Sequence, residues 1–574
     1  MTAKPISVAR SSRLPAAAPD SGGINWSGWV APLAGISVFV VAHAVYNSWK
    51  WLVRPFWGDE AMHNCSILAS SSLPDLVARI GFMSQPLLDH VLRKYFWFPI
   101  FGFQELGLRL PSIAYFWMLL VAGVLITAWF LKKNGHPSRF ALFAALLVGL
   151  WMTNKPSESW YAYEARHYSL VSLLSLCWFS LAMLGSRPTP VLWWTVTVLF
   201  ANVHFFALPV IAFVGVLDSW EAYREKGRRA GLLVLAGIAA VGAVTILVNL
   251  GAWRELTGHP PGARPEVLAG LKDAVLTFIA YIKYLGFPQK RLLVVLVWAG
   301  LLLAARRRDA GRLLLFVLVF FPLFLVAVKL KSNYAFGDRY YSPFFGAAFV
   351  TMVLALDRGR IALDSLIARR RLSSNAGRGV RWASLVLLFV MFGVGAACLH
   401  LTRLGRVFYV PRQNGGETAR VYEEIKKADK PVLLISESWW NWHRHILYLG
   451  YVGTPFRAAK WPVHDKYLNF ISTAYRHEVR LVKSQPLEGD VSQVPGEIRR
   501  FFADYPDGLV VLDQTDTANG CGSLPLPKLG KGITVTKPSD VLCIWLARGI
   551  RNPADLKRVA RAVQFRSLDW WQGK

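Results

Sequence analysis

Long apolar runs recur along most of this chain, and each run is bounded by charged residues, glycine or proline. A helix needs about 20 predominantly apolar residues to cross the hydrocarbon core of a bilayer. The runs therefore predict a polytopic α-helical membrane protein with about eleven transmembrane helices. The expected spans are residues 28–49, 111–131, 139–153, 168–184, 190–203, 204–218, 229–250, 290–305, 311–330, 341–357 and 381–401.

The composition agrees with a membrane protein. Of the 574 residues, 54% are hydrophobic and 17% are charged, whereas about 25% are charged in soluble domains. The net charge of +30 is typical of nucleic-acid-binding proteins, but also of loops that face anionic lipids. Because the arginine clusters lie between apolar runs, we expect membrane lipids as partners and no nucleic acid.

The placement of Lys and Arg predicts the orientation, since cytoplasmic loops are enriched in both. With the N-terminus inside, these residues are about twice as dense in the inside segments as in the outside ones. This orientation requires residues 190–218 to form a hairpin that turns near 202–204, because a single span would place the basic stretch 224–229 outside. The amphipathic segment 267–287 is expected to lie on the outer side as an interfacial helix.

The spans divide the chain into three parts. Residues 1–27 are expected to form a cytoplasmic tail, and residues 28–401 the transmembrane part with a first external loop over 50–110. With eleven spans, residues 402–574 lie outside the cytoplasm.

The final part has a different pattern from the spans. Polar and apolar residues mix, with short apolar runs at 432–435, 509–512 and 541–544 and a helical pattern at 417–428. This pattern predicts a soluble α/β domain. Cys521 and Cys543 fall in this domain, where they either form a disulfide or stay as free thiols.

Two adjacent carboxylates, Asp59 and Glu60, follow the first span directly. The helix dipole favours acidic residues at a helix N-terminus, so a solvated helix start would explain both. A carboxylate at a membrane surface is also suited to act as a general base. His63 lies one helical turn after Asp59, which leaves a divalent metal on these three side chains as an alternative. We otherwise expect no metal and no cofactor.

Five further motifs follow in order, and the expected topology places all of them on the outer face. They are Gln85-Pro-Leu87, Glu105-Leu-Gly-Leu-Arg-Leu-Pro-Ser112, Tyr163-Glu-Ala-Arg-His-Tyr168, His204-Phe-Phe206 and Arg339-Tyr-Tyr-Ser-Pro343. Together with the acidic pair, they resemble the GT-C superfamily of membrane glycosyltransferases. The chain looks close to glycosyltransferase family 39, which includes the protein O-mannosyltransferases, and to the aminoarabinose transferase that modifies lipid A. The resemblance covers about residues 30–345.

The resemblance implies that a sugar is transferred, with inversion, from a polyprenyl-phosphate donor to an extracytoplasmic acceptor. The acceptor would be a lipid, a glycan or a protein. Asp59 would be the general base and Glu60 would orient the acceptor. The expected location is a bacterial inner membrane, with the N-terminus cytoplasmic and the C-terminal domain periplasmic.

The donor phosphate would be bound by Arg166 and Arg339, because a guanidinium group pairs well with phosphate oxygens. Gln85 stands where the family commonly has lysine, and it can donate a hydrogen bond but carries no charge. Arg93 and Lys94 are further candidates. The alternative is that Arg166 and Arg339 form ion pairs with the acids next to them in the sequence.

The remaining candidates would bind the sugar or the prenyl chain. They are Tyr163, Glu164, Tyr168, His204 and Tyr340. Tyrosines also gather at membrane interfaces without a catalytic role. Asp89 and Glu105 are expected to be structural.

Two other classes of membrane protein handle lipid-linked glycans. A transporter or flippase would place ionisable residues within its spans and often shows inverted repeats, and the sequence shows neither. An O-antigen ligase or polymerase would rely on a large late external loop with Arg and His rather than on acids in the first loop. We therefore favour the transferase.

Overall fold

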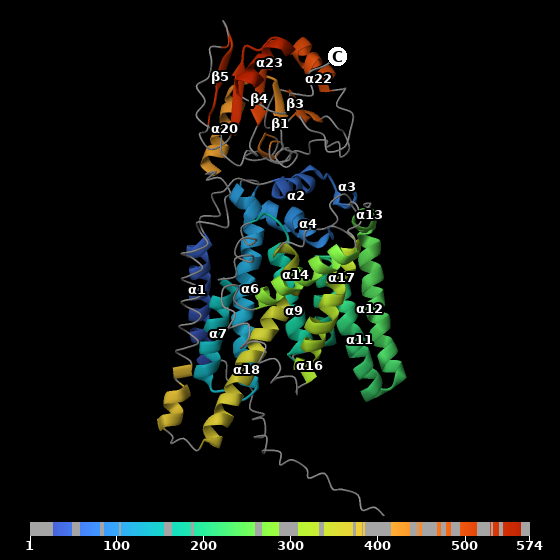
Figure 1. Ribbon diagram of the computed structural model, residues 1–574, viewed down its shortest axis with the longest axis vertical. Helices are drawn as coiled ribbons and strands as arrows, with labels where there is room; N and C mark the ends of the chain where they lie inside the picture. The colour runs from blue at the N-terminus through green and yellow to red at the C-terminus, as the bar shows by residue number, and fades with distance from the viewer. Residues whose placement is uncertain are drawn as a thin grey trace, which may run out of the picture.

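The computed structural model describes most of the helical part and much of the C-terminal domain. The described residues are 27–48, 58–80, 85–102, 105–153, 164–184, 189–258, 267–285, 308–331, 338–370, 375–381, 383–384, 415–436, 445, 447–449, 468–471, 478–483, 494–513, 529, 532–538 and 543–563. They form a bundle of helices with a small sheet domain at one end (Figure 1).

The long helices of the bundle follow the expected spans closely. They are α1 (Ser27–Ser48), α6 (Glu105–Lys133), α7 (Ser138–Thr153), α9 (Tyr168–Met183), α10 (Pro190–Ala201), α11 (Ala207–Lys226), α12 (Arg228–Val248), α16 (Arg308–Leu315), η3 (Phe316–Phe320), α17 (Phe321–Lys331) and α18 (Phe345–Arg369). The segments α16, η3 and α17 are consecutive and fill one expected span. The expected span at 290–305 and most of that at 381–401 lie outside the described residues.

The expectation of about eleven spans is met only in part. Within the described residues, four helices are long and apolar enough to cross a membrane, at 28–45, 106–133, 228–248 and 310–330. Helices α7, α9 and α10 are apolar but have at most 16 residues. In α11 and α18, charged residues begin at Asp218 and Asp357 and shorten the apolar stretch.

The predicted hairpin is confirmed, since α10 ends at Ala201 and α11 begins at Ala207. Asn202 closes the turn by donating a hydrogen bond to the Val198 carbonyl oxygen (2.9 Å), and its side-chain oxygen accepts one from Asn249 (3.2 Å). The amphipathic segment also forms a helix, α14 (Val267–Leu285).

Short helices from the first loop cover one end of the bundle. They are α2 (Gly58–Ala69), α3 (Leu73–Ile80), α4 (Leu88–Leu92), η2 (Arg93–Trp97) and α5 (Phe98–Phe101), and we call them the loop layer. Figure 1 shows α2, α3 and α4 between the bundle and the sheet domain. Gly102 adopts a φ of +72°, which glycine tolerates best, and it ends α5 before α6 begins.

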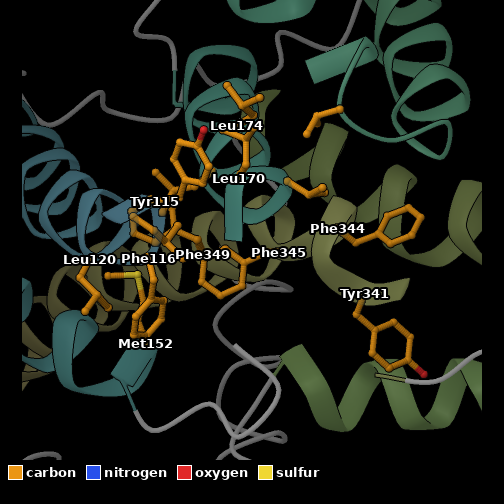
Figure 2. Packing of buried hydrophobic residues seen from close by; sticks show 14 of the residues in the cluster. Tyr115, Phe116, Leu120, Met152, Leu170, Leu174, Tyr341, Phe344, Phe345 and Phe349 are labelled. Atoms are coloured by element: carbon orange, nitrogen blue, oxygen red, sulfur yellow. The ribbon is translucent and has the colours of Figure 1, made fainter. Parts of the chain in front are cut away.

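Close approach of helices holds the bundle together. Residues of α6, α7, α9 and α18 interlock, among them Phe116, Met152 and Phe349 (Figure 2). A Cβ on Gly346 of α18 would lie 2.2 Å from the Ser175 carbonyl oxygen of α9. Small residues are enriched where membrane helices pack closely, because packing rather than the hydrophobic effect drives their association in lipid.

The C-terminal domain is α/β, as predicted. Its sheet has the order β2-β3-β1-β4-β6-β5, with β1 parallel to both β3 and β4. The strands are β1 (Val432–Ser436), β2 (Leu468–Ile471), β3 (Glu478–Lys483), β4 (Leu509–Asp513), β5 (Thr534–Thr536) and β6 (Ile544–Arg548); the helices are α20 (Gly415–Lys427), α22 (Val494–Asp504) and α23 (Pro553–Ala562). Ile544, the last residue of the apolar run expected at 541–544, begins β6, which pairs with β4 through Ala547; residues 541 and 542 lie outside the described ones.

Both faces of the sheet are buried at its central strands β1 and β4. Leu433 and Ile435 of β1 belong to a core shared with α22 and α23. Val432 and Leu434 point to the opposite face, whose core includes residues of α20. Residues buried on two faces explain why β1 and β4 read as continuous apolar runs. Cys543, just before β6, is disulfide-bonded.

Candidate functional site

A buried polar layer lies where the loop layer meets the bundle. In α2, Glu60, His63 and Asn64 are three and four residues apart and share one helix face. In α4 and η2 of the loop layer, Asp89 and Arg93 are four residues apart and share a helix face in the same way. All five side chains are buried. Buried polar groups of this kind are stable only when they are paired, so their partners define the architecture of the site.

Arg93 is the central support of this layer. Its Nε donates to Asp89 (2.6 Å), its Nη1 to the Leu108 carbonyl oxygen (2.9 Å) and its Nη2 to Ser112 (2.6 Å) and the Arg166 carbonyl oxygen (2.8 Å). The guanidinium therefore joins the loop layer to α6 and to the segment before α9. With its donors used inside the protein, Arg93 is a positioning residue rather than the phosphate contact suggested as an alternative.

Glu60 links the first and second loops. Its Oε1 accepts a hydrogen bond from the Ala165 backbone N–H (2.8 Å) and lies 3.6 Å from the Arg109 Nε. Asn64, one turn further, donates to the Ala165 carbonyl oxygen (2.9 Å). These contacts give Glu60 a structural role in holding residues 164–166, and its expected contact with the acceptor stays a prediction.

Three histidines, His63, His90 and His167, lie together in this layer, and we call them the histidine cluster. The ring centroid of His63 is 4.4 Å from that of His90 and 6.0 Å from that of His167. His63 Nε2 forms a hydrogen bond with Asp89 Oδ2 (3.1 Å), and His90 Nδ1 lies 3.3 Å from the Pro86 carbonyl oxygen.

The other ring nitrogens of the cluster are buried without a hydrogen-bond partner among the residues that the structure describes. They are His63 Nδ1, His90 Nε2 and both nitrogens of His167. Burial lowers the pKa of His63 to about 4 and holds the pKa of His90 and of His167 well below the usual value. The three rings are therefore neutral at pH 7.

Asp89 is charged beside these neutral rings. Burial alone would raise its pKa, but the Arg93 guanidinium and the hydrogen bond from His63 outweigh burial and hold the pKa well below its ordinary value. The expected structural role of Asp89 agrees with this geometry, and Asp89 also fixes the His63 ring.

Ring contacts extend the site to two further segments. The His167 ring lies 5.8 Å from His204, in the α10–α11 turn. His204 is 5.0 Å from Phe206, which is 6.0 Å from Tyr340 in η4 (Asp338–Phe344). Four segments that are distant in the sequence therefore meet at this end of the bundle.

The predicted site residues are placed to different degrees. Glu164, Arg166 and Tyr168 are buried, and the Arg166 guanidinium lies 4.9 Å from the centre of the Tyr168 ring. Gln85 Oε1 is buried without a partner among the described residues. Asp59 begins α2 and Arg339 belongs to η4, but both side chains lie outside the described ones, as does all of Tyr163.

Lys94 and Glu105 are the two remaining candidates of the first loop, and the structure describes only the Lys94 side chain. Lys94 donates to Ser70 Oγ (2.8 Å) and to the Ile67 carbonyl oxygen (3.3 Å), so it ties η2 to α2. The Glu105 side chain lies outside the described ones. For the metal alternative, no group of three His, Cys, Asp or Glu within the described ranges has a metal-binding arrangement.

Sequence reasoning missed the histidine cluster, because His90 and His167 were not singled out. A usable signal exists in the order Leu-Leu-Asp89-His90-Val-Leu-Arg93, where polar residues interrupt an apolar helical stretch. The partner ring of His167 comes from α2, about a hundred residues away, and no local spacing predicts that contact.

A separate polar network lies at the carboxyl ends of β1 and β4. Asp513 Oδ2 accepts hydrogen bonds from His445 Nε2 (2.6 Å) and Ser436 Oγ (3.2 Å), and His445 Nδ1 lies 2.7 Å from the Tyr422 hydroxyl. These side chains are all buried. The network fastens α20 and His445 to the end of the sheet.

Comparison with known proteins does not add to this geometry. No protein-family model matches the sequence, and no curated protein matches it. The resemblance to membrane glycosyltransferases stays a prediction.

Proposed function

We propose that this protein is an integral-membrane glycosyltransferase of the GT-C type. It transfers a sugar, with inversion, from a polyprenyl-phosphate donor to a lipid, glycan or protein outside the cytoplasm. The observation that carries the proposal is the meeting of four segments at one end of the bundle. Each of the four contains one of the motifs on which the resemblance rests.

The chemistry of these segments suits the reaction. The acceptor hydroxyl must lose a proton as it attacks the anomeric carbon, and Asp59 at the start of α2 is the general base. The leaving phosphate gains negative charge, which Arg166 and Arg339 stabilise. Glu60 supports this arrangement by holding the backbone before Arg166 in place. A lipid-linked donor presents its phosphate at the membrane surface, which is where a helix-bundle end would lie.

The charge pattern supports an outward orientation for this end. Lys132, Lys133, Arg224, Arg228 and Arg358 cluster at the opposite end, which we call the basic end. Cytoplasmic connections are enriched in Lys and Arg. The disulfide at Cys543 fits an oxidising compartment for the sheet domain. We therefore propose about eleven spans in a bacterial inner membrane, with the sheet domain in the periplasm.

The test is transfer by the purified full chain in lipid nanodiscs. A panel of radiolabelled polyprenyl-phosphate sugars, pentose and hexose, is offered together with membrane glycolipid, oligosaccharide and protein acceptors. We expect label in one acceptor fraction, and Asp59→Asn to reduce transfer at least about 100-fold. Asp75→Asn in α3 is the matched control, because Asp75 is also in the loop layer but its partly exposed carboxylate accepts hydrogen bonds from Ser71 and Arg79.

Two outcomes would contradict this proposal. Full activity of Asp59→Asn would remove the general base from the mechanism. Movement of labelled donor across a vesicle bilayer without any transfer to an acceptor would instead identify a flippase.

A further inference from the structure

The histidine cluster is not used by the reaction as described so far. Four of its ring nitrogens are buried and have no protein partner within the described residues. Leaving a buried polar atom unpaired costs about 1–3 kcal/mol, so such groups in a folded protein call for an explanation. A bound polar ligand is one explanation and ordered water is another.

The charges around the cluster decide between ligand classes. Asp89 is paired with Arg93 at 2.6 Å, and Glu60 lies 3.6 Å from Arg109, so these pairs bring no net charge. Arg166 approaches the cluster from the segment before α9 and interacts with both His63 and His167. Within the described part of the chain, the charged and titratable groups that interact with the three histidines are Asp89 and Arg93 of α4 and η2, Arg166 and Tyr168 near the start of α9, and His204.

Neutral imidazoles next to a guanidinium are suited to an anion that arrives with a proton. An imidazole N–H donates to an anionic oxygen, and a protonated ring donates from both nitrogens. His63 is prepared for a positive charge, because the Asp89 carboxylate lies 3.1 Å from its Nε2 on the side away from the unpaired Nδ1. The three rings come from separate elements of the loop layer and from the segment before α9.

We propose that His90 and His167, together with His63, bind the phosphate group of a prenyl phosphate and take up one proton when that phosphate is a monoester. The identity of the ligand rests on the proposed function; the proton uptake does not.

The stoichiometry follows from the change in the donor. A sugar–phosphate–prenyl diester carries one negative charge. Transfer breaks its anomeric C–O bond and leaves a prenyl phosphate monoester, whose second charge is present above a pKa of about 6. One proton from solvent binds to an imidazole and balances that second charge, and no bond within the monoester changes. The cluster therefore favours the product side of the leaving-group step.

The experiment measures binding and proton uptake by calorimetry on the full chain in nanodiscs at pH 7.5. A C15 prenyl monophosphate is titrated in two buffers of different ionisation enthalpy. We expect uptake of about one proton per ligand, and affinity that tightens by up to about tenfold when the pH is lowered by one unit. The corresponding prenyl methyl phosphate, a diester, should bind with uptake near zero.

Variants assign the effect to the cluster. His167→Gln is expected to weaken monophosphate binding about tenfold and to reduce the proton uptake; His90→Gln is the second variant if the first does not fold. His136→Gln, at the basic end, is the matched control and should behave like the wild type.

The remaining arms separate the sources of the phosphate. Tighter binding of the prenyl monophosphate than of inorganic phosphate supports a lipid ligand, and equal affinity overturns that part. Uptake near zero for the wild type, unchanged uptake in both histidine variants, or equal binding of the prenol without phosphate would overturn the proposal and leave water as the occupant. Sugar transfer without proton uptake on prenyl monophosphate binding would contradict only this inference. Proton uptake without any sugar transfer would contradict only the proposed function.

Discussion

The two ends of the bundle treat the same residue type in opposite ways. At the basic end, His136 Nε2 is bonded to Asp357 (2.8 Å), and the same carboxylate oxygen accepts a hydrogen bond from Asn134 (3.1 Å). At the loop end, neither ring nitrogen of His167 has a hydrogen-bond partner among the described residues. His136 thereby ties the turn between α6 and α7 to α18, whereas the ring nitrogens of His167 are left for a bound ligand or water.

Arginines at the two ends show a similar contrast. Arg312 of α16 pairs with Asp218 (3.0 Å) and with Glu221, both on α11, and these contacts tie two helices together. Arg93 at the loop end also fastens elements together, but the backbone that it holds contains Arg166, a candidate for phosphate binding. At the basic end these polar contacts hold helices together, and at the loop end they also hold the residues of the candidate site in place.

The largest expected effect is that of Arg93→Met. The substitution leaves the Asp89 carboxylate buried without its guanidinium and should cost about 3–5 kcal/mol. Thermal unfolding in detergent and the monodisperse fraction would show the loss. Arg312→Met is the comparison at the basic end. It should lower stability but not phosphate binding in the protein that remains folded, and a normal melting temperature for Arg93→Met would refute the support role of Arg93.

Acidification should act on the loop end next. The unfolded chain protonates His63 near pH 6.5, but the folded chain does so only near pH 4. Stability is therefore complete above pH 6.5 and is lost as the pH falls from 6.5 towards 4, by about 2 kcal/mol at pH 5 for this residue. Melting temperatures at pH 7.5 and 5.0 test this, with His63→Gln expected to flatten the dependence. An equally steep dependence in that variant would contradict the assignment.

A matched pair of histidine substitutions comes third. His136→Phe should cost about 1–3 kcal/mol, because Asp357 loses a buried hydrogen-bond donor. His167→Phe should not lower the stability, because the substitution breaks no hydrogen bond to the described residues and removes two buried unpaired nitrogens. Chemical denaturation of both variants measures the difference. Equal losses would mean that His167 has a structural partner after all.

The smallest effect is expected for Arg79→Ala. Arg79 Nε bonds Asp75 (2.8 Å) with the same four-residue spacing as Arg93 and Asp89, but this pair is partly exposed on α3. Partly exposed pairs of this kind contribute about 0.5 kcal/mol or less. Transfer activity and melting temperature should match the wild type, and a loss comparable to that of Arg93→Met would show that spacing rather than burial sets the effect.

Periodicity and charge placement were enough to predict most of the helices. The turn between α10 and α11 was predicted from the basic residues 224–229, because basic segments were expected to face the cytoplasm. The apolar runs of β1 and β4 predicted the α/β domain. The number of spans was harder to predict, because charged residues begin at Asp218 and Asp357 inside helices that continue beyond them.

The candidate site was predictable in its location but not in its roles. The order of motifs placed Glu60, Arg166, His204 and Tyr340 at one end, and ring contacts and hydrogen bonds connect their segments. The hydrogen bond from the Ala165 backbone to Glu60 was not predictable, since a carboxylate that follows a span has the same sequence pattern whether it binds substrate or protein.

The sequence by itself determined which segments are apolar helices, that an α/β domain follows them and which motifs share an end of the bundle. Those properties depend on local periodicity and on charge, and both can be read along the chain. Only the tertiary structure decided that His63, His90 and His167 meet and that Arg93 is fully bonded inside the protein. The His63 ring thereby meets rings that are 27 and 104 positions away in the sequence, and the pairing is chosen by packing of the whole bundle rather than by spacing along the chain.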